Sequence, residues 1–122
     1  MRYTRDIETE LYNLLTECGI NASAHSLPHS LGSNLPHIHV VRTGGYESDM
    51  VIENNYIDID VYAEDDAEAM RTASLLCGWI RDLEGRYCYM SNITTLPYGN
   101  PDPRHPNIAR ATFKAQILTR TV

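Results

Sequence analysis

The clearest alternation of apolar and polar residues lies in the middle of the chain, at residues 56–62. Ile57 and Ile59 alternate there with Asp58 and Asp60. Successive side chains of a strand point to opposite faces of its sheet. The pattern therefore predicts a strand with one buried face and one polar face.

Three further segments have the pattern of strands. Residues 109–120 alternate between small or apolar residues and polar or basic ones, which predicts a long final strand. Residues 37–42 and 87–96 predict two shorter strands. The glycines of residues 43–45 predict a turn after the first of these, and Pro97 is expected to end the second.

Two segments repeat apolar residues at helical spacing. The first runs from Ile7 to Cys18 and ends at Gly19, a residue that suits the left-handed stop of a helix. The second begins at Asp65, whose carboxylate can cap the first backbone N–H groups, and Gly85 is expected to stop it. Its apolar stripe consists of Ala69, Met70, Ala73, Leu76, Cys77, Ile80 and Leu83.

The remaining segments lack periodicity. Residues 20–36 predict a long irregular connection, and the four prolines within residues 97–107 predict a stiff extended loop. Residues 43–55, between the first two strands, either extend a hairpin or form a projecting loop. A connection of that length in a small domain often serves a function.

The order helix, two strands, helix, two strands predicts an α+β fold. We expect a single mixed, mostly antiparallel sheet of four to five strands, with two helices packed on one face. The chain of 122 residues is the size of one domain. We therefore expect residues 1–122 to form a single domain, with a projecting loop around residues 43–55.

Charge and composition narrow the class of function. Ten Lys and Arg residues against 16 Asp and Glu residues give a net charge of −6, which disfavours general nucleic-acid binding. The start of the chain has no signal-peptide pattern, and no apolar run reaches the roughly 20 residues that span a bilayer. We therefore expect a soluble protein that is not secreted, with its three cysteines reduced.

One constellation could bind a metal ion. His37 and His39 share a face of one predicted strand, and Asp58 and Asp60 share a face of the next. The alternative is that basic residues of the last strand satisfy these carboxylates by ion pairs across the sheet. We favour the ion pairs, for which the candidate cations are Arg110, Lys114 and Arg120.

Motifs of nucleophilic catalysis and of phosphate binding are missing from the sequence. It has no G-x-S-x-G elbow, no G-x-x-x-x-G-K-[ST] loop and no G-x-G-x-x-G turn. We predict a protein that is not an enzyme, with no catalytic residue, no metal and no cofactor.

Several apolar residues have no place in the predicted core. Tyr46, Met50 and Ile52 lie in the connection between two strands, and Leu75 and Trp79 lie one turn apart on the polar side of the second helix. Exposed apolar clusters often mark surfaces that bind a partner. We expect these residues at a subunit or partner interface, unless the loop folds back or the helix is rotated.

Taken together, the chain from about residue 5 onwards resembles the tail terminator proteins of long-tailed bacteriophages, also called tail completion or head-to-tail joining proteins. The order and spacing of six segments carry the resemblance. They are the first helix, Pro36–Gly45, Tyr56–Ala63, the helix with an acidic cap, the Pro101-Asp102-Pro103 loop and the final strand.

The resemblance implies a structural protein of the virion tail or neck, assembled in the host cytoplasm. Its subunits form a ring, in this family hexameric, that caps the tail tube, ends tube elongation and joins the tail to the head connector. By position, Thr43–Asn55 would reach a neighbouring subunit or the tube protein. Arg110 would match a basic interface residue of the family, although Ala111 follows it where a bulky residue is expected.

Genomic DNA would pass through such a ring without specific binding, and an acidic lumen suits that passage. We therefore expect acids to face the lumen or a boundary between subunits. The candidates are Asp58, Asp60, Glu47, Asp49 and Glu53.

Three alternatives remain open at this point. The chain could be another neck component, such as a stopper or head-completion protein. It could be a small metal-dependent enzyme that uses the His37, His39, Asp58 and Asp60 set. It could also be a monomeric α+β binding module, in which case Leu75 and Trp79 would be buried.

Overall fold

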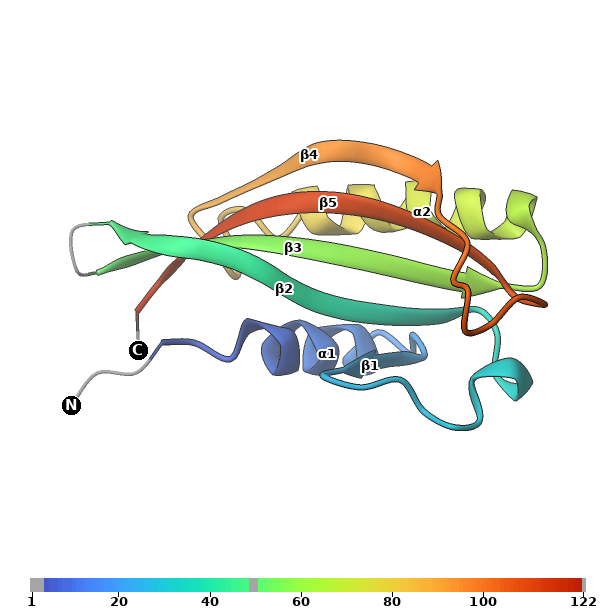
Figure 1. The fold of residues 1–122 in the computed structure, drawn as a ribbon. Helices are drawn as coiled ribbons and strands as arrows, with labels where there is room; N and C mark the ends of the chain where they lie inside the picture. Colours follow the sequence, from blue (N-terminus) through green and yellow to red (C-terminus); the bar gives the residue numbers. More distant parts are fainter. Residues whose placement is uncertain (1–3, 49–50, 122) are drawn as a thin grey trace.

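The two segments with the strictest alternation form the centre of one five-stranded sheet. The computed structural model describes residues 4–48 and 51–121, and in it β3 pairs antiparallel with β5 along its whole length. The strand order is β1-β2-β3-β5-β4 (Figure 1). The strands are β1 (Ala22–Ala24), β2 (His37–Ser48), β3 (Ile52–Ala63), β4 (Met90–Gly99) and β5 (Ala109–Arg120).

Helix α1 (Ile7–Glu17) ends at the stop expected from the sequence, and its start is capped by Asp6, which the pattern did not single out. The carboxylate of Asp6 accepts a hydrogen bond from the N–H of Thr9 at the N-terminus. Gly19 has a φ of 77°, and the next residue, Ile20, donates its N–H to the carbonyl of Leu15 at 3.0 Å. These two features form a Schellman motif, which satisfies the last carbonyls of the helix.

Helix α2 (Asp66–Arg81) begins as expected, because the Asp65 side chain accepts a hydrogen bond of 2.8 Å from the N–H of Glu68. The helix ends one turn earlier than expected. Gly85 has a φ of 82° and belongs to the turn that leads towards β4. No helix in the described part of the chain is both long and apolar enough to cross a membrane.

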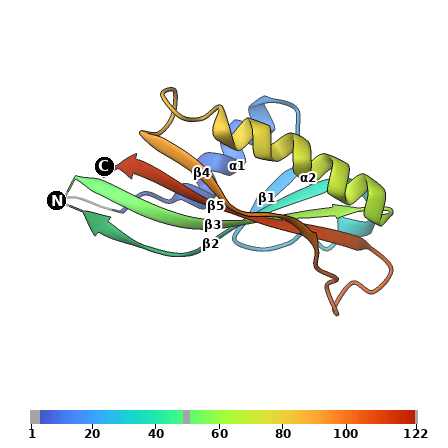
Figure 2. The ribbon, with the colours of Figure 1, turned by 90° about the horizontal axis from the view of Figure 1, so that it is seen from above.

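Both helices cover the same face of the sheet, which confirms the predicted α+β fold (Figure 2). α1 lies over β1 and β2, and α2 lies over β3, β5 and β4. Apolar side chains of the alternating strands meet the helical stripes in one core. Among its fully buried members are Ile7, Leu11, Val40, Ile57, Ile59, Val61, Ala73, Phe113 and Ile117.

The structure differs from the predicted elements in the segment 20–36. This connection contains a short strand, β1, that pairs in parallel with residues Ile38–Val40 of β2, and a single 3-10 turn, Leu31–Ser33. Three residues of Ala-Ser-Ala are too few for alternation to be recognised. The strand depends on the neighbouring β2 rather than on its own sequence.

Two predicted strand ends are also wrong. β2 continues through Gly44 and Gly45, with a register shift between Arg42 and Gly44, because this β-bulge absorbs the glycines within the strand. β4 continues past Pro97 to Gly99, with register shifts against β5 between Ile93 and Thr95 and between Thr95 and Tyr98. Proline is tolerated there because β4 is an edge strand, so the missing N–H breaks no ladder on its open side.

Candidate assembly surface

β2 and β3 run on beyond α1 as a projecting hairpin, whose β3 strand still pairs with β5 (Figure 1). We call its described residues, 43–48 and 51–56, the distal hairpin. The structure therefore has an extended hairpin in place of the projecting loop. Tyr46 is 55% exposed, and its ring lies 6.4 Å from the ring of the exposed Tyr56. Ile52 is half-buried, and the predicted interface residue Met50 lies outside the described residues.

The backbone of the distal hairpin depends on glycine at one position. Gly45 has a φ of 146°, and a Cβ there would collide with the carbonyl oxygen of Asn54 on the facing strand. Gly44 has a similar φ, but a Cβ at that position would meet open space. Gly45 is thus required for both its conformation and the close approach of the two strands.

Glu53 anchors the distal hairpin, near its tip, to the segment before α1 and is buried. Its side chain is only 2% exposed, and its carboxylate accepts hydrogen bonds of 3.1 and 3.2 Å from the N–H of Arg5. The guanidinium of Arg42 lies 3.9 Å away. The expectation that Glu53 faces a lumen or seam is therefore wrong. Glu47, its cross-strand partner, is exposed, and Asp49 lies outside the described residues.

Helix α2 presents Leu75 to solvent and keeps Trp79 partly covered. Leu75 is 74% exposed, as its position on the polar side predicts. Trp79 is half-buried and packs against the core, so the expectation that it faces away from the sheet is wrong. The helix is rotated enough for the large indole ring to reach the core from the edge of the apolar stripe.

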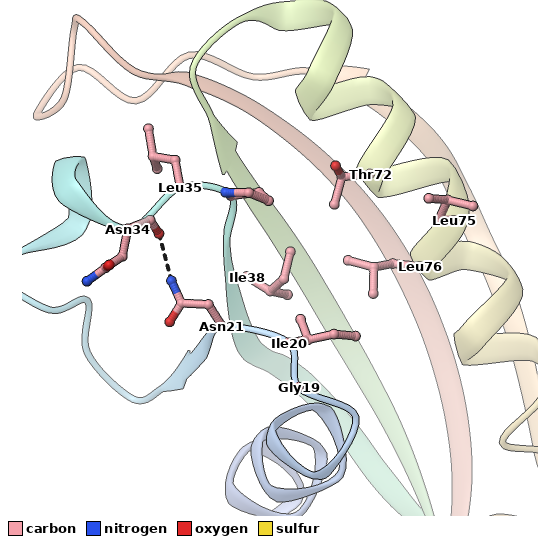
Figure 3. A pocket seen from close by; sticks show the side chains of 10 residues that line it. Gly19, Ile20, Asn21, Asn34, Leu35, Ile38, Thr72, Leu75 and Leu76 are labelled. Atoms are coloured by element: carbon pink, nitrogen blue, oxygen red, sulfur yellow. Dashed lines mark hydrogen bonds between the residues drawn. The ribbon is translucent and has the colours of Figure 1, made fainter.

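Leu75 stands at the rim of an apolar groove between the two helices (Figure 3). The groove has a volume of about 660 Å³. Leu76 and Thr72 form one wall, Ile38 lies at its floor, and residues of the turn after α1 form the other wall. Asn21 closes this second wall by donating a hydrogen bond of 2.6 Å to the carbonyl of Asn34.

On the opposite face of the sheet, the predicted metal ligands have other partners. Lys114 lies 3.0 Å from the carboxylate of Asp58, which is the cross-strand ion pair favoured from the sequence. The hydroxyl of Thr112 donates a hydrogen bond of 2.7 Å to Asp60. No group of three or more His, Cys, Asp or Glu side chains among the described residues is arranged to hold a metal ion.

His37 and His39 share the hydroxyl of Ser23, which belongs to β1. The Ser23 Oγ lies 2.8 Å from His37 Nε2 and 2.9 Å from His39 Nδ1. Both rings are buried, and this burial lowers the pKa of each imidazole. Two neutral histidines thus tie the short edge strand to β2.

The Pro-rich loop folds onto the polar face of the sheet through Asp102, which is 8% exposed. Its carboxylate accepts hydrogen bonds from the Tyr62 hydroxyl at 2.9 Å, the Arg104 N–H at 3.0 Å and His105 Nδ1 at 3.1 Å. Burial alone would raise the pKa of Asp102. These hydrogen bonds and the charge of Arg110 outweigh it and lower the pKa to about 2.

Arg110 makes its contacts within the subunit, and its expected place at an interface stays a prediction. Its Nε donates to the carbonyl of Asn100 at 2.5 Å, and its guanidinium lies 3.7 Å from the Asp102 carboxylate. The guanidinium also lies over the Tyr62 ring, 5.8 Å from its centroid. Arg110 therefore holds the Pro-rich loop against β3 and β5.

No protein-family model matches this chain, and no curated protein is significantly similar to it. The structural features that bear on function are the distal hairpin with Tyr46 and the rim of the groove at Leu75. The Asp102 cluster and the buried Glu53 are contacts that sequence patterns did not predict. The two prolines beside Asp102 were the one local signal of a fixed loop.

Proposed function

We propose that this chain is the subunit of a ring that caps the tail tube of a long-tailed bacteriophage. The ring ends tube elongation and joins the tail to the head connector. The observation that carries the proposal is the distal hairpin, which projects beyond the helices and exposes the aromatic pair Tyr46 and Tyr56. Exposed apolar groups on a projecting element suit contact with another subunit.

Further support comes from the character of the surfaces. Leu75 adds a second exposed apolar group, on α2, next to the apolar groove. Asp58 and Asp60 lie on the face of the sheet away from the helices, and Glu47 is exposed on the distal hairpin. With a net charge of −6, we infer that these acids line the lumen or the subunit boundaries, where they keep DNA from binding.

The test is to polymerise the tail tube protein of the same phage with and without the purified chain, and to measure tube lengths by electron microscopy. We expect rings at one end of the tubes and an end to their growth. Native mass spectrometry of the rings gives the copy number, for which we expect six.

Matched variants make this test specific. We expect Tyr46→Asp to abolish capping and Glu64→Gln, at an exposed position remote from the hairpin, to leave it intact. Rings that bind the head connector but never the tube would instead assign the chain to another neck ring. A chain that binds neither and stays monomeric would overturn the proposal.

A further inference from the structure

The sheet has an open edge along the distal part of β2. β1 pairs with β2 only at Ile38–Val40, and beyond it the carboxylate of Glu8 accepts a hydrogen bond of 3.2 Å from the N–H of Arg42. Past that point, no described residue pairs with Thr43–Ser48 on the side away from β3. We call Thr43–Ser48 the β2 edge.

A second open edge lies on the other side of the sheet. Residues Met90–Ile93 of β4 pair in register with β5, and within the described chain their other side faces no strand. The N–H of Ser91 in this segment donates a hydrogen bond of 3.1 Å to the carboxylate of Glu84, a side chain that the added strand must displace. The two register shifts and Pro97 interrupt the strand only after Ile93. We call Met90–Ile93 the β4 edge.

The two edges lie in the same rows of the sheet. Tyr46 pairs with Asn54, which pairs with Leu118, which pairs with Met90. The parallel row two residues further along runs from Gly44 through Tyr56 and Gln116 to Asn92. Both open edges are therefore at the same level, at the end of the sheet where the distal hairpin projects (Figure 1).

The strand directions also match. β2, β3, β5 and β4 alternate in direction across the sheet, because each neighbouring pair is antiparallel. A second copy placed beside the first, with its β2 edge against this β4 edge, continues that alternation. Such a contact joins two different surfaces head to tail. When the joined rows stay level and the rotation from copy to copy closes, repeating it gives a ring instead of an open helix.

Most side chains at the two edges are uncharged. Glu47 is the only charged residue within either edge, and the carboxylate of Glu84 lies beside the β4 edge, at the N–H of Ser91. Six of the seven large hydrophobic residues that are exposed in the described chain lie on the distal hairpin or on β4 and the residue before it. They are Tyr46, Val51, Tyr56, Tyr89, Leu96 and Tyr98. Edges of this kind favour pairing with another strand.

We propose that neighbouring copies of this chain join by adding the β2 edge of one copy to the β4 edge of the next. One antiparallel sheet then continues around the ring, with the Tyr46 ring of each copy beside the Met90 thioether of its neighbour. The inference rests on the proposed ring and adds to it the identity of the two surfaces that meet.

Disulfide trapping tests this pairing directly. Paired strand residues have Cα atoms about 4.5–5.5 Å apart, a separation that a disulfide can bridge. In a Cys18→Ser background, which removes the exposed native thiol, we expect Tyr46→Cys with Met90→Cys to give covalent multimers up to the closed ring. Tyr46→Cys with Leu75→Cys is the matched control and is expected to give no such multimers.

Amide hydrogen exchange separates strand pairing from a contact of side chains alone. We expect the N–H groups that point outward from both edges, apart from that of Ser91, which already donates to Glu84, to exchange at least tenfold more slowly in the ring than in the monomer. Rings that form without the cross-link and without this protection would overturn the strand pairing and leave the proposed ring standing. A chain that forms no ring, either alone or on tail tubes, would overturn both.

Discussion

The hydroxyl of Tyr62 donates a hydrogen bond of 2.9 Å to the carboxylate of Asp102, across 40 residues of sequence. The contact fixes the Pro-rich loop to the face of the sheet away from the helices. Burial raises the pKa of Tyr62 to about 12, so the phenol keeps its proton and remains a donor at neutral pH. The loop is thus held by a charged acceptor and several donors.

Replacement of Asp102 should destabilise the protein. Asp102→Ala leaves Tyr62, His105 and Arg110 without their shared acceptor, and hydrogen bonds to charged groups contribute about 1.5–3 kcal/mol each in favourable cases. We expect a loss of about 2–4 kcal/mol in the free energy of unfolding, measured by urea denaturation. Glu64→Ala, at an exposed position, should change it by less than about 0.5 kcal/mol.

The Tyr62–Asp102 contact can also be isolated. Tyr62→Phe removes only the hydroxyl and should cost about 1 kcal/mol. A double-mutant cycle with Asp102→Ala should then give a coupling free energy of about 0.5–3 kcal/mol. Strict additivity of the two changes would contradict the role given to this contact.

Stability should fall in mild acid because His37 and His39 are buried. Their pKa values are lowered in the folded chain, so the unfolded chain binds protons more readily below the ordinary histidine pKa of about 6.5. The stability that the two neutral histidines contribute is complete above a pH of about 6.5. It is lost as the pH falls from there towards their lowered pKa values in the folded chain. Urea denaturation from pH 7.5 to 5 measures this slope.

The double variant His37→Gln/His39→Gln should flatten the slope between pH 6.5 and 5. The exposed His29 provides the control, and His29→Gln should leave the slope as it is. A second loss of stability at lower pH belongs to Asp102, whose lowered pKa of about 2 means that its contribution disappears as the pH falls below about 4. An unchanged slope in the double variant would exclude the histidines as its source.

Glu53 and Glu47 face each other across the distal hairpin but should respond differently to substitution. Glu53→Ala removes a buried carboxylate and leaves the half-buried N–H of Arg5 without its acceptor, and we expect a loss of about 2–4 kcal/mol in the free energy of unfolding. Glu47→Ala changes an exposed side chain and should cost less than about 0.5 kcal/mol. Equal effects in chemical denaturation would contradict the buried position of Glu53.

Leu75 and Leu76 are neighbours on α2 with opposite exposure, at 74% and 5%. Leu76→Ala should cost about 2–5 kcal/mol because it removes a buried side chain. Leu75→Asp should leave the free energy of unfolding nearly unchanged and reduce capping of tail tubes, measured by electron microscopy. Full capping by a stable Leu75→Asp variant would remove Leu75 from the proposed interface.

The sequence predicted those elements whose signal is local. Alternation around Ile59 and Phe113 located the two central strands, and Asp65 and Gly19 located helix ends, since capping depends on a few adjacent residues. β1 escaped prediction because its pairing partner lies about 16 residues away. The alternation of apolar and polar residues within one segment does not predict a strand that forms only by pairing with another segment.

The candidate surface was predicted less completely than the fold. The exposure of Tyr46 and Leu75 was expected, because both lie outside every apolar stripe. The inward positions of Glu53 and Arg110 were not, since each depends on partners that are distant in sequence, Arg5 and Tyr62. A charged residue that is buried by distant partners looks, in the sequence alone, like one on the surface.

Gly45 should control both the shape of the distal hairpin and the assembly that depends on it. Alanine there meets two obstacles, the φ of 146° and the collision of its Cβ with the Asn54 carbonyl, whereas Gly44→Ala meets only the first. We expect Gly45→Ala to cost at least about 1 kcal/mol more than Gly44→Ala. Because Tyr46 directly follows Gly45, displacement of the strand should also move Tyr46 out of register with Met90 of the neighbouring copy. Native mass spectrometry should then show fewer closed rings for Gly45→Ala than for Gly44→Ala. Equal ring formation by the two variants would show that the β2 edge is not part of the contact between neighbouring copies.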